Sequence, residues 1–232
     1  MKARTVRRCC RPGALAAGAL SIAGFVFAGV TSAAPLPPSD PWNELPVATL
    51  ATQPVSALQL GRIKIWLEFN TLADVIKVAG ANPIAHFEDD EASYDWLCYD
   101  ADAHRQRLWF VSDTDMGGEQ RMVTSIVAML VEAPSDPSAA CPLLPKALSS
   151  VALDRAIWLG TRDGELAKKL GEPSSSLRDW QSFYSNHRML APRKTPNEEG
   201  AMDDDVDESS YLNVRLVDGR VVQLVACKLT GG

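Results

Sequence analysis

Apolar positions along the chain follow helical and strand spacings in turn, and this pattern predicts a mixed fold. Residues 63–69 alternate as in a short strand, and residues 72–79 place apolar side chains at helical spacing behind Thr71, a suitable helix N-cap. Gly80 and Pro83 then end the helix. Further strands are predicted at residues 94–99, 106–112 and 121–131, with an acidic loop at 85–93 and turns at 100–105 and 113–119.

The same order of elements returns in the second half of the chain. An Ile-Trp-Leu triplet opens each unit, at Ile65 and Ile157, and a glycine-ended helix and an Asp-Trp strand follow in both. The second unit is predicted to have a strand at 151–159, a helix capped by Thr161 or Asp163 and running to Leu170, strands at 179–185, 211–217 and 220–229, and a hairpin turn at Asp218-Gly219. Matching elements in a fixed order indicate a duplicated unit. We therefore expect an α+β fold of two tandem units, each a short helix packed on an antiparallel sheet of about three or four strands.

Stretches rich in proline and small residues separate the units. The expected boundaries are a signal peptide at 1–33, a Pro-rich tether at 34–58, repeat unit 1 at 59–132, a linker at 133–150, and repeat unit 2 at 151–232 with an acidic insertion at 192–210.

The first residues are typical of a secretory signal. A basic stretch precedes an apolar, Ala- and Gly-rich run, and Thr31-Ser32-Ala33 supplies the small residues that predict cleavage after Ala33. An uncleaved membrane anchor is the alternative, because the run of about 17 residues is near the minimum for a span. Cleavage would predict a periplasmic or secreted protein without a membrane anchor.

Removal of the signal would make the protein strongly acidic. It would take five of the 23 basic residues and none of the 29 acidic ones, leaving 18 basic against 29 acidic and a net charge of −11. Nucleic acid and anionic membrane surfaces are therefore not expected as partners, because both require a positive surface.

Three cysteines remain after the predicted cleavage site: Cys98, Cys141 and Cys227. In an exported protein they allow one disulfide in three possible pairings. We favour Cys98 with Cys141, which would join the first unit to the linker that follows it. Cys227 lies in an apolar strand and is expected to act as a small buried hydrophobic residue.

Catalytic and metal-binding motifs are not apparent in the sequence. The histidines are His86, His104 and His187, each beside charged residues. His86 with the acidic residues at 88–90 could hold a metal ion, and the acidic run at 203–208 could hold calcium, but a solvated polar surface explains both runs without a ligand. We therefore expect no cofactor, no metal and no enzymatic activity.

Aromatic side chains on the predicted strands are the main candidates for function. Alternation along a strand sends Trp96 and Tyr99 to opposite faces, so a helix covering one face would leave some rings on the open face. Exposed Trp and Tyr side chains are common anchors of protein interfaces. The alternative is that both faces are covered. The candidate partner-binding residues are Trp96, Tyr99, Trp109, Trp180 and Tyr184.

One stretch of the second unit resembles a known module. The residues that carry the resemblance are Leu170-Gly171-Glu172-Pro173, Trp180, and 211–226 with its Asp218-Gly219-Arg220-Val221 turn. They are similar to the helix-plus-meander module of the SmpA/OmlA (BamE-like) envelope proteins and of the tandem-repeat beta-lactamase inhibitor proteins. The resemblance implies a module that binds other proteins through a sheet face. The chain departs from the first family in having no lipidated cysteine, and from the second in having too few cysteines for one disulfide in each repeat.

These observations together predict an exported, non-enzymatic protein that binds an envelope or periplasmic protein. The alternatives are an inhibitor or immunity protein of a periplasmic enzyme, whose acidic loops could cover a basic active site, and a hydrolase whose catalytic residues are scattered in the sequence.

Overall fold

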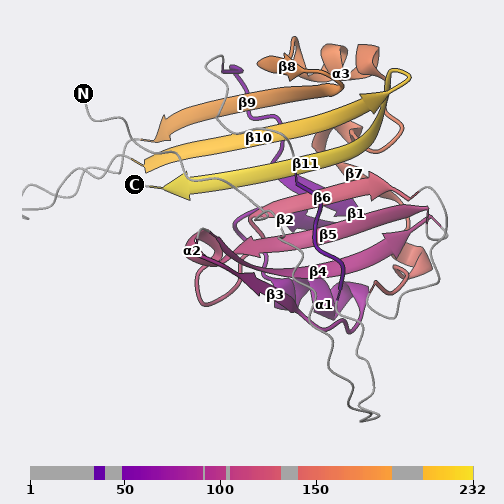
Figure 1. The fold of residues 1–232 in the computed structure, drawn as a ribbon, viewed down its shortest axis with the longest axis vertical. Helices are drawn as coiled ribbons and strands as arrows, with labels where there is room; N and C mark the ends of the chain where they lie inside the picture. Colours follow the sequence, from indigo (N-terminus) through magenta and orange to yellow (C-terminus); the bar gives the residue numbers. More distant parts are fainter. Residues whose placement is uncertain are drawn as a thin grey trace, which may run out of the picture.

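The largest element of the fold is an eight-stranded antiparallel sheet (Figure 1). The computed structural model of the 232-residue chain describes residues 34–39, 49–90, 92–102, 105–131, 141–189 and 206–231. The order of the strands is β3-β4-β5-β6-β11-β10-β9-β8. The first four are β3 (Ala85–Glu88), β4 (Ser93–Ala101), β5 (Gln106–Asp113) and β6 (Ser125–Leu130). The other four are β8 (Ser175–Leu177), β9 (Trp180–Met189), β10 (Val206–Val217) and β11 (Arg220–Gly231).

A second layer covers one face of this sheet and lies behind it in Figure 1. The layer contains helices α1 (Leu72–Ala79) and α3 (Asp163–Leu170), and a three-stranded sheet of order β2-β1-β7. The strands of this small sheet are β1 (Ala57–Leu60), β2 (Ile63–Trp66) and β7 (Val151–Leu153). One-turn helices lie at α2 (Thr114–Gly117), η1 (Lys146–Leu148) and η2 (Asp154–Ala156). The prediction of an α+β fold is therefore confirmed.

The two main helices begin in different ways. The Thr71 side chain accepts a hydrogen bond from the Asp74 backbone, and the Asp74 carboxylate accepts one from the Thr71 backbone, which is a capping box. The N-cap residue of helix α3 is Arg162, whose side chain makes no capping hydrogen bond, so the predicted caps Thr161 and Asp163 are wrong. The Thr161 hydroxyl instead accepts a hydrogen bond from the Trp158 backbone at 3.0 Å. Helix α3 is stabilised instead by charges that complement its dipole, with acidic residues in the first turn and lysines in the last turn.

The main hydrophobic core lies between the helix layer and the large sheet. The buried faces of the two helices are formed by Leu72 and Val75 of α1 and by Leu166 and Leu170 of α3. They pack against inward side chains of strands from both halves of the sheet: Leu97, Tyr99, Phe110, Ile126, Phe183, Leu212, Val214 and Leu224. Burial of the strand side chains under the helices joins the two halves into one core.

Strands β6 and β11 join the halves of the large sheet. They pair antiparallel from Gln223 with Met129 to Cys227 with Ser125. The predicted hairpin at Asp218-Gly219 connects β10 to β11, and both turn residues have positive φ, at 50° and 67°. Asp and Gly tolerate this region, so the prediction of this turn is confirmed.

Short strands were missed by the sequence patterns. Strand β1 begins inside the predicted tether, β3 lies in the predicted acidic loop, and β8 precedes the predicted strand at 179–185. Each has three or four residues. Strand β1 is held on one side by β2 and on the other by β7, which lies far away in the sequence. A run this short has too little alternation to be recognised without its partners.

Strands β9 and β10 extend further than predicted. The predicted insertion at 192–210 includes residues 206–210, which instead continue β10 and pair with β9. Acidic residues such as Glu208 suggested a loop, but Lys228 Nζ on β11 lies 3.0 Å from the Glu208 carboxylate. This ion pair compensates the charge of Glu208 within the sheet. Residues 192–205 of the insertion lie outside the described part of the chain.

Positive φ values explain why three predicted strands are shorter. The predicted strand at 151–159 ends at Leu153, and Arg155 and Ala156 then have φ of 60° and 52°. Glu68, with φ of 58°, follows the end of β2. Arg121, with φ of 53°, precedes β6, which begins only at Ser125. L-residues seldom adopt these values within a strand.

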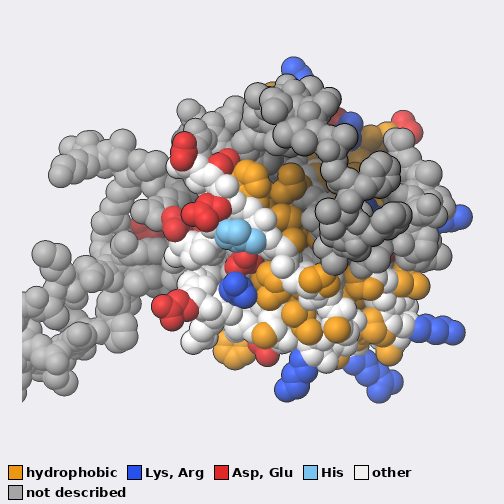
Figure 2. Space-filling model, turned by 60° about the horizontal axis from the view of Figure 1, so that its bottom comes forward, with side chains coloured by type: hydrophobic (Ala, Val, Ile, Leu, Met, Phe, Trp, Pro, Cys, Tyr) orange, Lys and Arg blue, Asp and Glu red, His pale blue; other side chains and the backbone are white. Residues whose placement is uncertain are grey.

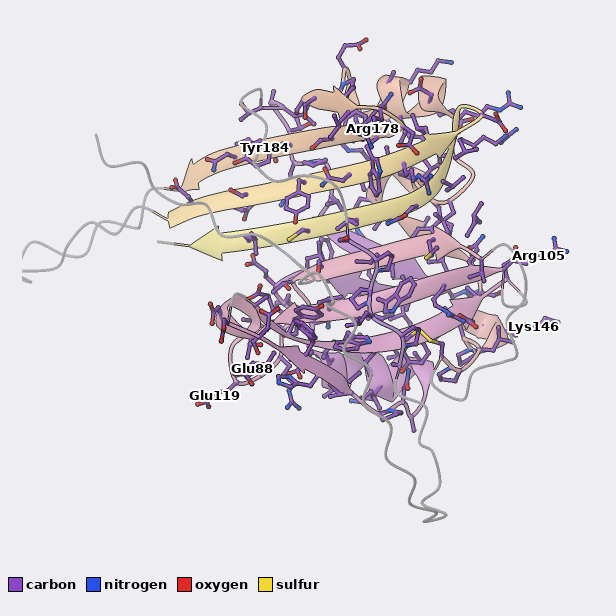
Figure 3. The ribbon with its side chains drawn as sticks, in the orientation of Figure 1. Glu88, Arg105, Glu119, Lys146, Arg178 and Tyr184 are labelled. Carbon is purple, nitrogen blue, oxygen red and sulfur yellow. A yellow bond between two sulfur atoms is a disulfide. The ribbon has the colours of Figure 1, made fainter. Side chains whose placement is uncertain are left out.

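The predicted disulfide between Cys98 and Cys141 is present, with an S–S distance of 1.98 Å (Figure 3). It joins β4 to the segment after the first half of the sheet. Cys227 is fully buried in β11, but it is not the leftover thiol of the prediction, because it is also disulfide-bonded. Among the described residues, no helix is long and apolar enough to cross a membrane. The predicted signal at 1–33 lies outside those residues.

Candidate functional site

The large sheet has a second face, on the side away from the helices, and aromatic side chains concentrate there. We call this surface the aromatic face and define it by Tyr94 and Trp96 of β4, Trp109 of β5, Tyr184 of β9 and Tyr211 of β10. These residues belong to a buried cluster that is separate from the main core. Alternation along each strand places them opposite the helix-facing residues.

Strand register brings the aromatic residues together. Trp96 on β4 pairs with Val111 on β5, and Val111 lies two positions from Trp109 on β5. The indoles of Trp96 and Trp109 are therefore diagonal neighbours. The ring centroids of Tyr94 and Trp96 lie 5.6 Å apart. In the other half of the sheet, Tyr211 lies directly opposite Tyr184, whose position on β9 is labelled in Figure 3.

A short N-terminal segment, Ala34 to Ser39, lies on this face. The indole N–H groups of Trp96 and Trp109 both donate to the main-chain carbonyl of Pro35, at 3.0 and 2.9 Å. At the other end of the segment, Gln223 Nε2 on β11 donates to the Ser39 carbonyl at 3.4 Å. The segment therefore crosses the strands from β4 to β11 and covers the junction of the two halves.

Beyond Gln223, buried and uncharged polar side chains lie beside Tyr184 and Tyr211 on this face. Ser182 and Asn213 lie opposite each other on β9 and β10, on the same side as Tyr184 and Tyr211. Ser182, Asn213 and Gln223 are 1%, 3% and 7% exposed. The aromatic face thus joins an apolar half that carries indole donors to a half that carries neutral hydrogen-bonding groups.

The structure changes the interpretation of the predicted partner-binding residues. Trp96, Trp109 and Tyr184 lie on the aromatic face, but they are buried, so the alternative that both faces are covered describes them correctly. Tyr99 is a correction: it lies in the main core, where its hydroxyl donates to the Gly80 carbonyl at 2.8 Å. Burial there raises the pKa of Tyr99 to about 12. Trp180 is buried and belongs to neither cluster.

Pro35 was not among the predicted site residues, because residues 34–58 were predicted to be a tether. Local sequence shows which strand positions share a face, but it does not show which distant segment will cover that face. The signal that was available is the proline content at positions 35, 37 and 38, because proline-rich segments commonly dock on aromatic surfaces.

A second cluster of polar residues surrounds His86 on β3, at the edge of the sheet. His86 Nδ1 lies 2.9 Å from the Asp95 carboxylate, and Arg121 Nε lies 2.7 Å from the other Asp95 oxygen. His86 Nε2 faces Glu88 at 3.6 Å. Figure 2 shows a histidine among acidic and basic side chains on this surface. Both ring nitrogens of His86 therefore face carboxylates, whereas a nucleophilic site requires a hydroxyl or thiol next to one of them.

Two other chemical candidates, His104 and the acidic run at 203–205, lie outside the described residues. Within residues 34–39, 49–90, 92–102, 105–131, 141–189 and 206–231, no group of three or more His, Cys, Asp or Glu side chains could hold a metal ion.

Comparisons with known proteins found no protein-family model, curated protein or solved structure that matches this chain. The resemblance to the BamE-like and beta-lactamase inhibitor modules therefore rests on the residues that carry it.

Proposed function

We propose that this chain is an exported, non-enzymatic protein that binds another protein of the envelope or periplasm through its aromatic face. The observation that carries the proposal is the pair of indole donors on one peptide carbonyl, Trp96 and Trp109 to Pro35. This face already holds a peptide segment by its backbone. A protein partner would present the same groups.

The composition of the face supports binding to protein. Its cluster consists of aromatic, aliphatic and cysteine side chains, and the charged residues at its margin, Asp100 and Arg107, neutralise each other in an ion pair at 2.7 Å. Interface centres are rich in Trp and Tyr and poor in charged residues. Indole and phenol groups also allow an apolar surface to satisfy the polar groups of a bound backbone.

Two further observations support the wider proposal. Counted inward from each edge, the strands follow the order of the chain in both halves of the sheet, β3 to β6 in one half and β8 to β11 in the other. This matching order supports two tandem units placed edge to edge. The disulfide between Cys98 and Cys141 supports an oxidising compartment, because disulfides persist in exported proteins.

Affinity capture tests this function. The full chain, its Trp96→Phe/Trp109→Phe variant and its Trp66→Phe variant are immobilised and exposed to an envelope extract, and retained proteins are identified by mass spectrometry. Trp66 is a matched control, because it lies on β2, is 42% exposed and is outside the aromatic face.

We expect one protein to be retained by the parent chain and the control but lost from the double variant, which lacks both indole donors. Equal recovery on all three supports, or no retained protein at low and at moderate salt, would contradict the proposal. If the retained protein is an enzyme, inhibition of that enzyme by the parent chain would identify the protein as an inhibitor.

A further inference from the structure

The segment on the aromatic face has a three-residue pattern of burial. From Ala34 to Ser39 the side chains are buried, half-buried, exposed, then buried, half-buried and exposed again. A polyproline II helix has three residues per turn, so it presents every third side chain to the same surface. Ala34 and Pro37 face the sheet, and Leu36 is 39% exposed on the opposite side. Prolines at 35, 37 and 38 restrict φ to the value that this helix needs.

The length of the segment also fits this conformation. Pro35 is held between β4 and β5, and Ser39 is held on β11, two strands beyond β5. Across the strands that separation is about two and a half strand spacings, or roughly 12 Å, and the register offsets Gln223 by two residues along the strands from Trp109, so the segment crosses them obliquely. Four steps of a polyproline II helix at about 3.1 Å also give roughly 12 Å. The hydrogen bonds at the two ends therefore match an extended helix that crosses the strands.

We infer that the aromatic face is a binding site for proline-rich peptides in the polyproline II conformation, and that residues 34–39 occupy it in cis. The inference rests on the proposed function, because it uses the same face. The ligand would be a proline-rich segment of another protein with a free carbonyl for the indoles of Trp96 and Trp109. A carbonyl next to proline suits these donors, since a polyproline II helix leaves its carbonyls without internal hydrogen bonds.

Occupation in cis would also regulate binding. Nine residues separate Ser39 from Thr49, where the described chain resumes. A tether this short gives the segment an effective concentration in the millimolar range, so a free peptide must compete with it. A partner therefore binds in proportion to the fraction of molecules in which the segment has left the face.

The variant Pro37→Asp would displace the segment, because it places a charge against the apolar cluster. Leu36→Asp is the matched control, since it introduces the same charge one residue earlier, on the exposed side. The readout is the indole 1H–15N NMR spectrum of the chain. The signals of Trp96 and Trp109 are assigned with single Phe variants. Trp158, whose indole donates to Gln106 Oε1 at 2.8 Å in the main core, reports whether the fold is intact.

In the parent chain and in Leu36→Asp we expect the Trp96 and Trp109 indole protons to be hydrogen-bonded and slow to exchange. In Pro37→Asp both signals should move and exchange faster while the Trp158 signal stays. Addition of the peptide Ala-Pro-Leu-Pro-Pro-Ser to Pro37→Asp should restore the Trp96 and Trp109 signals. The peptide should bind this variant at least about tenfold more tightly than it binds the parent chain. The peptide Ala-Ala-Leu-Ala-Ala-Ser should not.

Unchanged Trp96 and Trp109 signals in Pro37→Asp would overturn the inference, as would equal binding, or no binding, of both peptides to this variant. The capture experiment separates this failure from that of the proposed function. If Pro37→Asp retains an envelope protein but not the proline peptide, the proline-rich ligand is wrong and protein binding stands. If it binds the peptide while no protein is retained from the extract, the peptide site stands and the envelope partner is wrong.

Discussion

Asp154 connects two distant parts of the small sheet, and its removal should cost measurable stability. Its carboxylate Oδ2 accepts hydrogen bonds from the backbone N–H groups of Ser56 and Ala57, both at 2.9 Å, and from the Ser56 hydroxyl. Lys64 Nζ lies 3.3 Å from Oδ1. These contacts fix the start of β1 to the turn that follows β7, almost a hundred residues later in the chain.

The expected loss in Asp154→Ala follows from these contacts. A hydrogen bond to a charged acceptor contributes about 1.5 kcal/mol at the lower end of its range, so three give about 4.5 kcal/mol. Asp154 is 20% exposed, and water can satisfy part of what is lost. Lys64 is 40% exposed and adds at most about 1 kcal/mol. We expect a decrease of about 3 kcal/mol in the free energy of unfolding, or about 6–12 °C in Tm.

The pH dependence gives an independent check. Burial opposes ionisation of Asp154, but the hydrogen bonds from Ser56 and the interaction with Lys64 outweigh it and hold the pKa below its ordinary value of 3.8. A carboxyl whose pKa is lower in the folded state stabilises the fold above its unfolded pKa, and this contribution is lost as the pH falls through the folded pKa. The difference between parent and variant should therefore be complete at pH 7 and smaller below about pH 4.

Urea unfolding of the oxidised chain, followed by circular dichroism at several pH values, measures both effects. Asp154→Asn should lose less than Asp154→Ala because an amide oxygen still accepts hydrogen bonds. Asp90→Asn, at an exposed position, is the control for removing one negative charge. A loss below about 0.5 kcal/mol in Asp154→Ala, or an equal loss at pH 3 and pH 7, would refute the reasoning.

Three further substitutions test other parts of the fold. Thr71→Ala removes one half of the capping box with Asp74 and should lower stability by about 1 kcal/mol, whereas Thr49→Ala, at an exposed position outside the helices, serves as the comparison in thermal unfolding. Tyr99→Phe should lose about 1 kcal/mol at neutral pH with its hydrogen bond. Because the pKa of Tyr99 is raised in the folded state, the parent loses stability as the pH rises from 10 towards 12, whereas Tyr99→Phe does not. The difference in the free energy of unfolding between parent and variant should therefore narrow by about 1 kcal/mol between pH 9 and 11. A constant difference between their urea midpoints over this range would contradict the prediction. Replacing Cys98 and Cys141 by Ser opens a loop of 43 residues and should cost about 4 kcal/mol in urea unfolding, so an unchanged midpoint would show that the bond adds no stability.

Elements with local signals were predictable from sequence. Helix α1 occupies the predicted residues 72–79, because Thr71 begins it, the apolar spacing marks its buried face and Gly80 ends it. The hairpin at Asp218-Gly219 is equally local. Strand β1 was missed because its four residues are held by β2 and β7, and β7 is far away in the sequence.

Prediction of the candidate site was partly successful for a related reason. Alternation correctly separated Trp96 from Tyr99, since the two lie in different clusters. It did not identify which face each occupies, so Tyr99 was included with the binding residues. Exposure depends on what covers a face, and the segment that covers Trp96 lies 61 residues earlier, at Pro35. Such a contact leaves no periodic trace in the strand itself.

The central position of β11 affects how the chain can reach its folded state. This strand follows the other strands of the sheet in the sequence, yet it pairs with β6 on one side and with β10 on the other. Until β11 is available, β6 is an unpaired edge that other chains could join, and the second half of the sheet lacks its strand pairing to the first. The high sequence separation between β6 and β11 favours slow folding. A premature stop at Arg220, which removes β11, would therefore split the sheet at its centre rather than trim its margin.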